Sequence, residues 1–287
     1  MLRRLLRVLA EPVPLRFLLL RALDRRLDFL DYRWKLNLGS VPYPEYGYGL
    51  LNAALLAKRL GHARVAAIEF GVAGGNGLVA LEHHAARVAA ETGVQVAVFG
   101  FDTGTGMPPP CDHRDMPYRW QGGYYRMDRE RLAARLHSAE LVIGEVARTV
   151  PEFCRRPALP PVGFVAFDLD YWSSTRTALH LFEAPAERLL PRVACYFDDI
   201  VGDLESAHNE FAGVRLAIAE FNAAHAMRRL AQVRGLRFYG PRIPRLWHEQ
   251  IFVAHLFDHP DYARPLNELT EMPLSDGPAP DAVWTRV

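Results

Sequence analysis

The chain has 287 residues, of which 50% are hydrophobic and 23% are charged, a balance typical of a folded protein with a large core. This composition excludes a disordered, collagen-like or coiled-coil protein. With 34 basic and 33 acidic residues the net charge is +1, so no nucleic-acid partner is expected. Three cysteines without metal-type spacing predict neither a disulfide framework nor a zinc ribbon, and they favour a cytoplasmic protein.

The first 47 residues are predicted to form a helical extension. Residues 3–26 fit a helix with leucines on one side and arginines elsewhere. Arg7 and Glu11 interrupt its apolar stretch, which is shorter than the roughly 20 residues of a membrane span, so we expect neither a span nor a signal peptide. Such a helix either packs with its arginines in solvent, or touches a membrane surface or a partner subunit, for example in a homo-oligomer.

The remaining residues, 48–287, are predicted to form one domain in which apolar runs alternate with helical patterns. Continuous apolar runs indicate strands buried on both faces, and alternation with helices indicates a doubly wound α/β fold with a mostly parallel, seven-stranded sheet. The predicted strands are 65–70, 94–101, 139–144, 163–169, 193–199, 235–240 and 249–257. The predicted helices are 48–60, 77–91, 128–138, 174–190 and 209–229. Ligands of such sheets bind at the carboxyl ends of the strands.

The first predicted strand ends in the sequence EFGVAGGNG, residues 69–77. Glycines before a helix let the backbone approach a ligand closely, and free N–H groups at the helix start favour a polar or negative group, so we expect a nucleotide-type cofactor. Residues 75–80 also match the dinucleotide fingerprint G-x-G-x-x-A. Because this match begins five residues after Phe70, its register is wrong, and a nicotinamide-dependent oxidoreductase is kept only as the alternative.

Two acids flank this loop at the ends of adjacent predicted strands. Glu69 would repel a pyrophosphate but attract the ammonium group of a methionine moiety. Asp102, in the sequence GFDTGTGMP, can accept hydrogen bonds from two ribose hydroxyls. Singly, Glu69 reads equally well as a surface charge and Asp102 as a turn or cap residue. Together with the glycine loop they favour the cofactor interpretation.

Three further aspartates follow the fourth and fifth predicted strands. Asp168 begins the sequence DLDYWSST, and Asp198 and Asp199 end the sequence FDD. Neighbouring strand ends would bring these three together, where like charges repel unless they are protonated or bound to a cation. Oxygen ligands alone favour a hard divalent ion such as Mg²⁺. The alternative is that Asp198 or Asp199 caps the following turn and Asp170 starts the next helix.

Residues 65–225 resemble the macrocin O-methyltransferase family of class I S-adenosylmethionine-dependent methyltransferases, which methylates sugar hydroxyls of macrolides with Mg²⁺. The similar segments are EFGVAGGNG, GFDTGTGMP, VIGEVARTVPEF, DLDYWSST and FDD. The resemblance implies a Rossmann-like methyltransferase domain over 48–287 that transfers a methyl group to a small-molecule hydroxyl, with a sugar or other diol as acceptor. The other alternative is a non-catalytic S-adenosylmethionine-binding subunit.

The resemblance also implies roles for particular residues. The implied metal ligands are Asp168, Asp198 and Asp199. The predicted catalytic residues are Asp168, as a metal ligand, and Asp170, as a candidate base. The implied cofactor contacts are Glu69, Gly71, Val72, Ala73, Asp102, Thr103, Gly144 and Glu145.

Two departures from the family concern the acceptor and the local loops. Gly104 and Thr105 stand where the family usually has an aromatic residue and an acid, and Pro191 and Arg192 stand where it has two glycines. The general base is open between Asp170, His113, His208 and His248. Segment 106–127 is long and aromatic, and it is either a lid over the acceptor or a packed surface loop.

Overall fold

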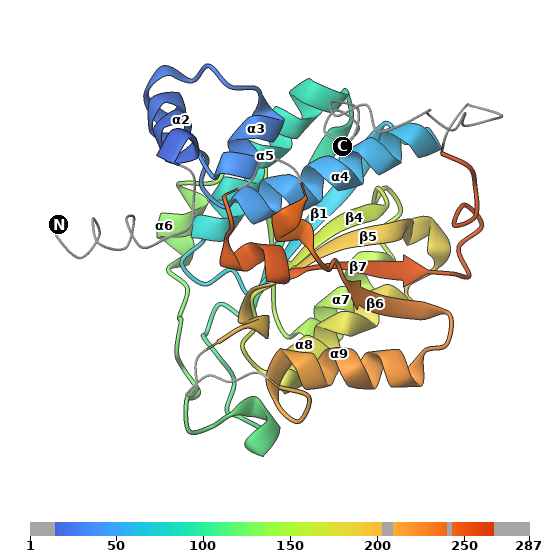
Figure 1. The fold of residues 1–287 in the computed structure, drawn as a ribbon. Helices are drawn as coiled ribbons and strands as arrows, with labels where there is room; N and C mark the ends of the chain where they lie inside the picture. The colour runs from blue at the N-terminus through green and yellow to red at the C-terminus, as the bar shows by residue number, and fades with distance from the viewer. Residues whose placement is uncertain (1–14, 203–208, 240–242, 267–287) are drawn as a thin grey trace, which may run out of the picture.

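A seven-stranded sheet forms the centre of the computed structural model, which describes residues 15–202, 209–239 and 243–266 (Figure 1). The strand order is β3-β2-β1-β4-β5-β7-β6, and β7 runs antiparallel to both of its neighbours. The strands are β1 (Arg64–Phe70), β2 (Gln95–Asp102), β3 (Glu140–Ile143), β4 (Val162–Phe167), β5 (Leu189–Phe197), β6 (Arg228–Gln232) and β7 (Ile251–Leu256). The predicted doubly wound, mostly parallel α/β sheet is therefore confirmed.

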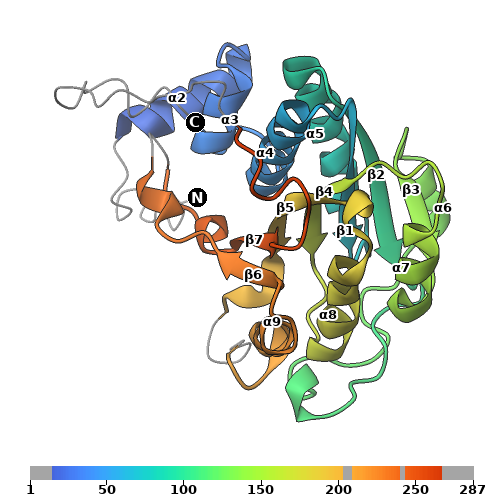
Figure 2. The same ribbon diagram turned by 90° about the vertical axis from the view of Figure 1, so that its right-hand side faces the viewer.

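Helices cover both faces of the sheet, as Figures 1 and 2 show. One face packs against α4 (Pro44–Leu60) and α5 (Asn76–Thr92), and the other against α7 (Val146–Cys154), α8 (Trp172–Ala178) and α9 (Gly213–Ala224). The short helix α6 (Arg129–Ala133) precedes β3. Alternation along β1 decides which face each side chain meets: Val65 and Ala67 join the α4 and α5 core, and Ile68 joins the opposite core.

A row of buried phenylalanines lies directly below the carboxyl edge of the parallel strands. Phe70, Phe167 and Phe197 are the last residues of β1, β4 and β5, and Phe101 is the last but one of β2. Their rings contact one another in sequence, with centroid separations of 4.9 Å for Phe70–Phe101, 5.4 Å for Phe70–Phe167 and 4.5 Å for Phe167–Phe197. Burial of these rings fixes the strand ends. The residues that follow them are consequently held together along one edge.

The sixth strand is not where the sequence predicted it. Within 235–240, residues Leu236–Phe238 form a single 3-10 turn, and residue 240 lies outside the described residues. The true β6, Arg228–Gln232, begins at the last two residues of the predicted helix 209–229 and continues beyond it. Because β6 is an edge strand that buries only Leu230, it lacks the continuous apolar run by which strands were recognised.

Three helix predictions were also wrong in extent. The predicted helix 174–190 ends at Ala178 as α8 and gives way to two 3-10 turns and then to β5; Pro185 lies between the two turns. The predicted helix 128–138 shrinks to α6, and 209–229 to α9. Helix α7 was not predicted. It contains Pro151 in its interior, a residue that is unfavourable inside a helix.

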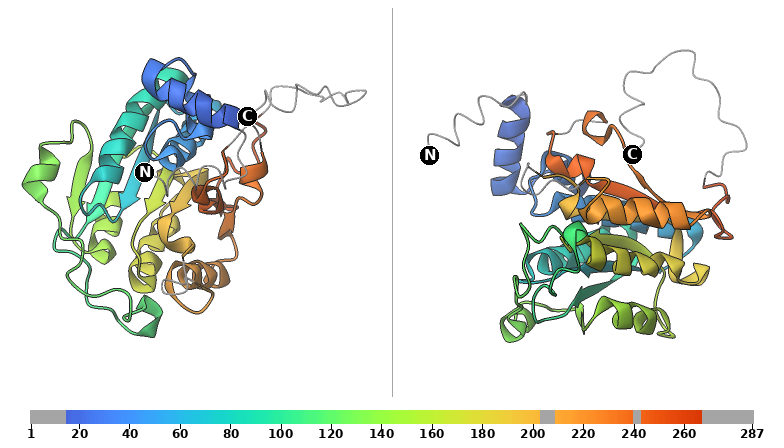
Figure 3. Two further views of the ribbon diagram at one scale, coloured as in Figure 1. Left: turned by 60° about the vertical axis from the view of Figure 1, so that its left-hand side comes forward. Right: turned by 90° about the horizontal axis from the view of Figure 1, so that it is seen from below.

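The N-terminal helices α2 (Leu15–Leu27) and α3 (Tyr32–Leu38) lie on the α4 and α5 side of the sheet (Figure 3). Tyr32 and Leu36 of α3 are buried in that core. Residues 3–14 of the predicted first helix lie outside the described residues. Helix α4 spans the predicted boundary between residues 47 and 48, and the division of the chain there stays a prediction. Among the described helices, none has the length and apolarity needed to cross a membrane.

Candidate active site

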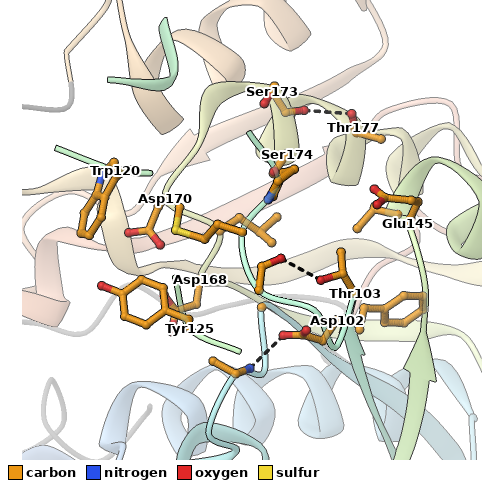
Figure 4. Close-up of a pocket in the computed structure, with 18 of the residues that line it drawn as sticks. Asp102, Thr103, Trp120, Tyr125, Glu145, Asp168, Asp170, Ser173, Ser174 and Thr177 are labelled. Atoms are coloured by element: carbon orange, nitrogen blue, oxygen red, sulfur yellow. Dashed lines mark hydrogen bonds between the residues drawn. The ribbon is translucent and has the colours of Figure 1, made fainter. Parts of the chain in front are cut away.

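A pocket of about 550 Å³ opens at the carboxyl edge of the sheet, within the size range of small-molecule sites (Figure 4). Its walls come from the residues after β1, β2, β4 and β5, from the starts of α7 and α8, and from segment 106–125. Of the sequence-predicted site residues, it brings together Gly71, Ala73, Asp102, Thr103, Glu145, Asp168, Asp170, Asp198 and Asp199. Glu69, Val72 and Gly144 are not among its lining residues.

In the glycine loop after β1, residues 71–75, the backbone of Gly71 packs against the backbone of Asp168. A Cβ at Gly71, where φ is +85°, would lie 1.7 Å from the carbonyl oxygen of Asp168, so only glycine fits between the ends of β1 and β4. The loop closes at Gly75, which caps the start of α5. Residues 76–80 therefore lie inside α5. The fingerprint-like match does not form a phosphate-binding loop after the strand.

Asp102 holds this loop in place. Its Oδ2 accepts hydrogen bonds from the backbone N–H groups of Val72 (3.0 Å) and Ala73 (2.8 Å), and its Oδ1 accepts one of 2.6 Å from Gly104. A carboxylate has roughly four acceptor positions, so about one remains for a ligand hydroxyl. Asp102 faces the pocket beside Thr103 (Figure 4). It thus shapes the loop as well as lining the site.

Glu69 lies beneath the loop rather than in the pocket. Alternation along β1 turns its side chain toward α4 and α5, where it is 2% exposed. Its Oε1 accepts a 2.7 Å hydrogen bond from the hydroxyl of Tyr46, and its Oε2 is buried with no hydrogen-bond partner. Burial raises the pKa of Glu69 well above its usual range, with a further contribution from the charges of Asp168 and Asp102.

The three aspartates predicted as metal ligands come together. Each of Asp168, Asp198 and Asp199 offers a carboxylate oxygen within 4.8 Å of the others. Enclosure by protein raises the pKa of Asp168 to about 8, with added repulsion from Asp198 and then Asp170. Burial likewise raises the pKa of Asp199 well above its usual range. Without a cation this cluster retains protons, and its all-oxygen donor set suits a hard divalent ion.

Neighbouring groups orient the cluster. The backbone N–H of Asp170 donates a 2.9 Å hydrogen bond to Oδ2 of Asp199, which links the segments that follow two strands. The residues that cap the next two helical turns are Tyr171 and Phe197, not these aspartates. The hydroxyl of Tyr196 donates to Oδ1 of Asp198, and the side-chain amide of Gln250 donates to the Asp198 carbonyl. Tyr196 and Gln250 were not anticipated from the sequence.

Asp170 stands beside the three-aspartate cluster in the pocket. It is 9% exposed and has a left-handed backbone, with φ of +56°. Burial raises the pKa of its carboxyl to about 6. An Asp with positive φ is uncommon, and here the backbone bond to Asp199 stabilises the conformation. A group that changes protonation near neutral pH is thereby held at the edge of the cluster.

Segment 106–127 is both a packed loop and a wall of the pocket. Asp115, fully buried, accepts 2.8 Å hydrogen bonds from the backbone N–H and the hydroxyl of Ser173 and from the backbone N–H of Cys111. These bonds fasten the segment to the start of α8. Its residues Trp120 and Tyr125 face the pocket near Asp168 and Asp170 (Figure 4). The role of this wall as an acceptor lid stays a prediction.

The histidines considered as general bases lie elsewhere. The His113 side chain is 85% exposed, and His248 is buried, its Nδ1 accepting a hydrogen bond from the backbone N–H of Arg245. His208 lies outside the described residues. Among the described residues that line the pocket, no histidine is present. The sequence also missed three hydroxyl side chains of α8 that line it: Ser173, Ser174 and Thr177.

Comparison with known proteins gave structural neighbours only. No family model and no curated protein matches the sequence. A structure of CalS11, a calicheamicin methyltransferase, aligns at 20% identity over 88% of this chain and 90% of its own, with a TM-score of 0.48. The O-methyltransferase NovP aligns at 12% identity over 74% and 80%, also with a TM-score of 0.48. The O-methyltransferase TomG from Streptomyces achromogenes, in complex with S-adenosylmethionine, aligns at 16% identity over 75% and 81%, with a TM-score of 0.42.

At these identities and scores, substrate and chemistry have to be argued from the residues of this chain. The arrangement of the sheet stands on its own strand order. Six strands run parallel, β7 is inserted antiparallel between β5 and β6, and the pocket lies at the carboxyl edge. The chain accordingly has the doubly wound, mostly parallel α/β fold with a seven-stranded sheet that its sequence predicted.

Proposed function

We propose that the protein is an S-adenosylmethionine-dependent O-methyltransferase that uses a divalent cation, with Mg²⁺ as the first candidate. The acceptor would be a small molecule with two adjacent hydroxyls, such as a sugar or another diol. The observation that carries the proposal is the shared pocket: the glycine loop and Asp102 form one side of it, and the three-aspartate cluster forms the other.

The cofactor side fits S-adenosylmethionine by charge. Asp102 keeps an acceptor position toward the pocket for a ribose hydroxyl, and Glu145 lines the wall where we infer the adenine to lie. The unpartnered Oε2 of Glu69, beneath the glycine loop, is the candidate partner for the ammonium group of the methionine moiety, which would reach it only if the loop moves aside. When bound, this cofactor would supply the methyl group.

The aspartate cluster fits a divalent cation. Asp168, Asp198 and Asp199 would hold it, because a cation removes the repulsion that raises the pKa values of Asp168 and Asp199. When bound, the cation would orient the acceptor hydroxyls and lower the pKa of the one that reacts. Tyr196, by its hydrogen bond to Asp198, would hold one ligand in position.

The chain's other residues would position the acceptor and remove its proton. Asp170, which lies next to the cluster but outside the ligand set, is the proposed proton acceptor. The rings of Trp120 and Tyr125 would cover the acceptor and exclude water. Methyl transfer needs an in-line approach of oxygen to the methyl carbon, so much of the rate acceleration would come from such positioning.

Two alternative functions, a nicotinamide-dependent oxidoreductase and a non-catalytic S-adenosylmethionine binder, explain the pocket less well. A nicotinamide-dependent oxidoreductase lacks support because the fingerprint-like residues lie within α5. A non-catalytic S-adenosylmethionine binder would have no use for three clustered aspartates beside the cofactor site.

The test combines binding with turnover. Calorimetry should show micromolar or tighter binding of S-adenosylmethionine or S-adenosylhomocysteine, and no binding of NAD or NADP. Methyl-labelled cofactor with Mg²⁺ and a panel of sugars and catechols should then give labelled product. Absence of cofactor binding at near-millimolar concentration contradicts the whole proposal, whereas binding without labelled product on any acceptor supports the non-catalytic reading.

A further inference from the structure

Helix α2 carries a row of exposed leucines. Leu15, Leu19, Leu23 and Leu27 are spaced four residues apart and therefore form one ridge along the helix. Their exposed fractions are 66%, 64%, 48% and 67%. Phe29, 52% exposed, extends the ridge beyond the helix end. A contiguous apolar strip of this kind on a protein surface marks an interaction site more often than isolated exposed leucines do.

A different side of α2 fixes the helix to the protein through one buried acid. Asp24 is 3% exposed and accepts hydrogen bonds from the Lys35 ammonium (2.6 Å), the Leu30 backbone (2.9 Å) and the Ser40 hydroxyl (2.5 Å). Asp24 thus faces inward, whereas the four leucines of the ridge remain exposed. Figure 3 shows α2 at the periphery of the molecule, beside α3.

Arginines lie among the leucines of the ridge. At about 3.6 residues per turn, Arg16 lies two turns before Leu23 and Arg26 three turns after Leu15, and both are exposed. The nearby acids are already paired, since Asp24 and Asp28 both bind the Lys35 ammonium. Residues 1–27 of the sequence contain seven arginines and two acids. The exposed side of α2 is therefore both apolar and positive.

We propose that this surface, α2 with its leucine ridge and flanking arginines, binds an anionic membrane. A helix of this type lies in the plane of the lipid headgroups, with leucines among the acyl chains and arginines at the phosphates. A second copy of the chain is a poorer occupant, because antiparallel pairing of two α2 helices would bring Arg16 of one near Arg26 of the other. Anionic lipid satisfies the apolar and the charged side chains together.

The test uses the full-length protein and flotation with vesicles. Vesicles of phosphatidylcholine and phosphatidylglycerol in equal amounts should bind the protein, and vesicles of phosphatidylcholine alone should bind it far less. Salt at about 0.5 M should weaken the binding, since it screens the charges. The double variant Arg16→Gln, Arg26→Gln should lower the affinity about 25-fold. The double variant Leu19→Ser, Leu23→Ser should abolish binding.

Matched controls replace residues of the same kind outside α2. Leu246→Ser changes a leucine that is 64% exposed, and Arg155→Gln with Arg234→Gln changes two exposed arginines. These variants should bind anionic vesicles as the unmodified protein does. The proposal is overturned if the protein does not bind anionic vesicles, or if the α2 variants bind as well as the controls. It is also overturned if sedimentation shows a dimer that the leucine variant dissociates while vesicle binding is unchanged.

Discussion

The hydroxyl of Tyr46 in α4 donates a 2.7 Å hydrogen bond to the carboxyl group of Glu69 at the end of β1, and both side chains are 2% exposed. This bond joins a helix that precedes the sheet to the strand that leads into the glycine loop. It occupies one oxygen of Glu69 and leaves the other without a partner. Glu69 is thus a buried acid with one structural contact and one free acceptor.

Replacement of Glu69 by Gln separates these two roles. Because burial raises the pKa of Glu69 well above its usual range, the fold disfavours the charged form, and the neutral Gln should change the free energy of unfolding by less than about 1 kcal/mol. Affinity for S-adenosylmethionine should fall by about tenfold or more, since a charged contact to the ammonium is lost. Calorimetry and urea unfolding measure the two effects.

The control for this variant is Tyr46→Phe, which removes the hydrogen-bond donor but not the acid. It should destabilise the fold by about 1–3 kcal/mol, because it leaves Glu69 buried without a partner. Unaltered cofactor affinity of Glu69→Gln would remove the proposed ammonium contact.

The aspartate cluster predicts a pH-dependent stability. The pKa of Asp168 is raised to about 8 and that of Asp199 is also raised, so between about pH 4 and pH 8 the folded protein binds more protons than the unfolded chain. Stability of the metal-free protein should therefore fall as the pH rises through this window. Added Mg²⁺ should raise Tm more at pH 8 than at pH 5, because protons compete with the cation. Equal Tm shifts at both pH values would contradict a site at these carboxylates.

Removal of one charge from the cluster should abolish turnover while sparing the cofactor. Asp198→Asn or Asp199→Asn keeps the size of the side chain but weakens cation binding, and the methyl-transfer rate should fall about 100-fold or more. Cofactor affinity measured without the cation should change by less than about threefold, since the glycine loop is untouched. Asp258→Asn, at an exposed ion pair with Arg228, is the matched control. Full activity in EDTA would show that no metal takes part.

Loss of the hydrogen bonds made by Asp115 should weaken binding of the methyl acceptor. Asp115→Ala leaves the Ser173 and Cys111 N–H groups without their acceptor and should lower the free energy of unfolding by about 2–4 kcal/mol. Because Trp120 and Tyr125 belong to the segment that this bond fastens, KM for the acceptor should rise. Ser173→Ala, which removes only the hydroxyl contact, should have a smaller effect. A KM as low as that of the unmodified protein would indicate that the segment does not cover the acceptor.

The site residues that were predicted correctly from the sequence share one local feature, their place at the end of an apolar strand. Asp102, Asp168 and Asp198 each follow an apolar strand, and a parallel sheet gathers such positions on one edge whatever the details of packing. Tyr46 and Asp115 have no such feature, because their partners Glu69 and Ser173 are 23 and 58 residues away in the chain. Contacts of that kind depend on how helices and loops pack on the sheet.

The error at the sixth strand has a similar cause. Hydrophobic runs identify strands buried on both faces, and β6, at the sheet edge with a single fully buried side chain, has no such run. The sequence predicted the four strands whose ends form walls of the pocket, and it misplaced β6 at the far edge of the sheet.

The close packing of Gly71 against the Asp168 carbonyl couples the position of the glycine loop to that of the aspartate cluster. Because no side chain fits between Gly71 and the Asp168 carbonyl, the end of β1 cannot shift without displacing the end of β4. Any strain that cofactor binding introduces at the loop should therefore reach the carboxylate of Asp168 directly. Occupancy of one side should alter affinity at the other, and by thermodynamic necessity the cation and the cofactor would influence each other by the same factor.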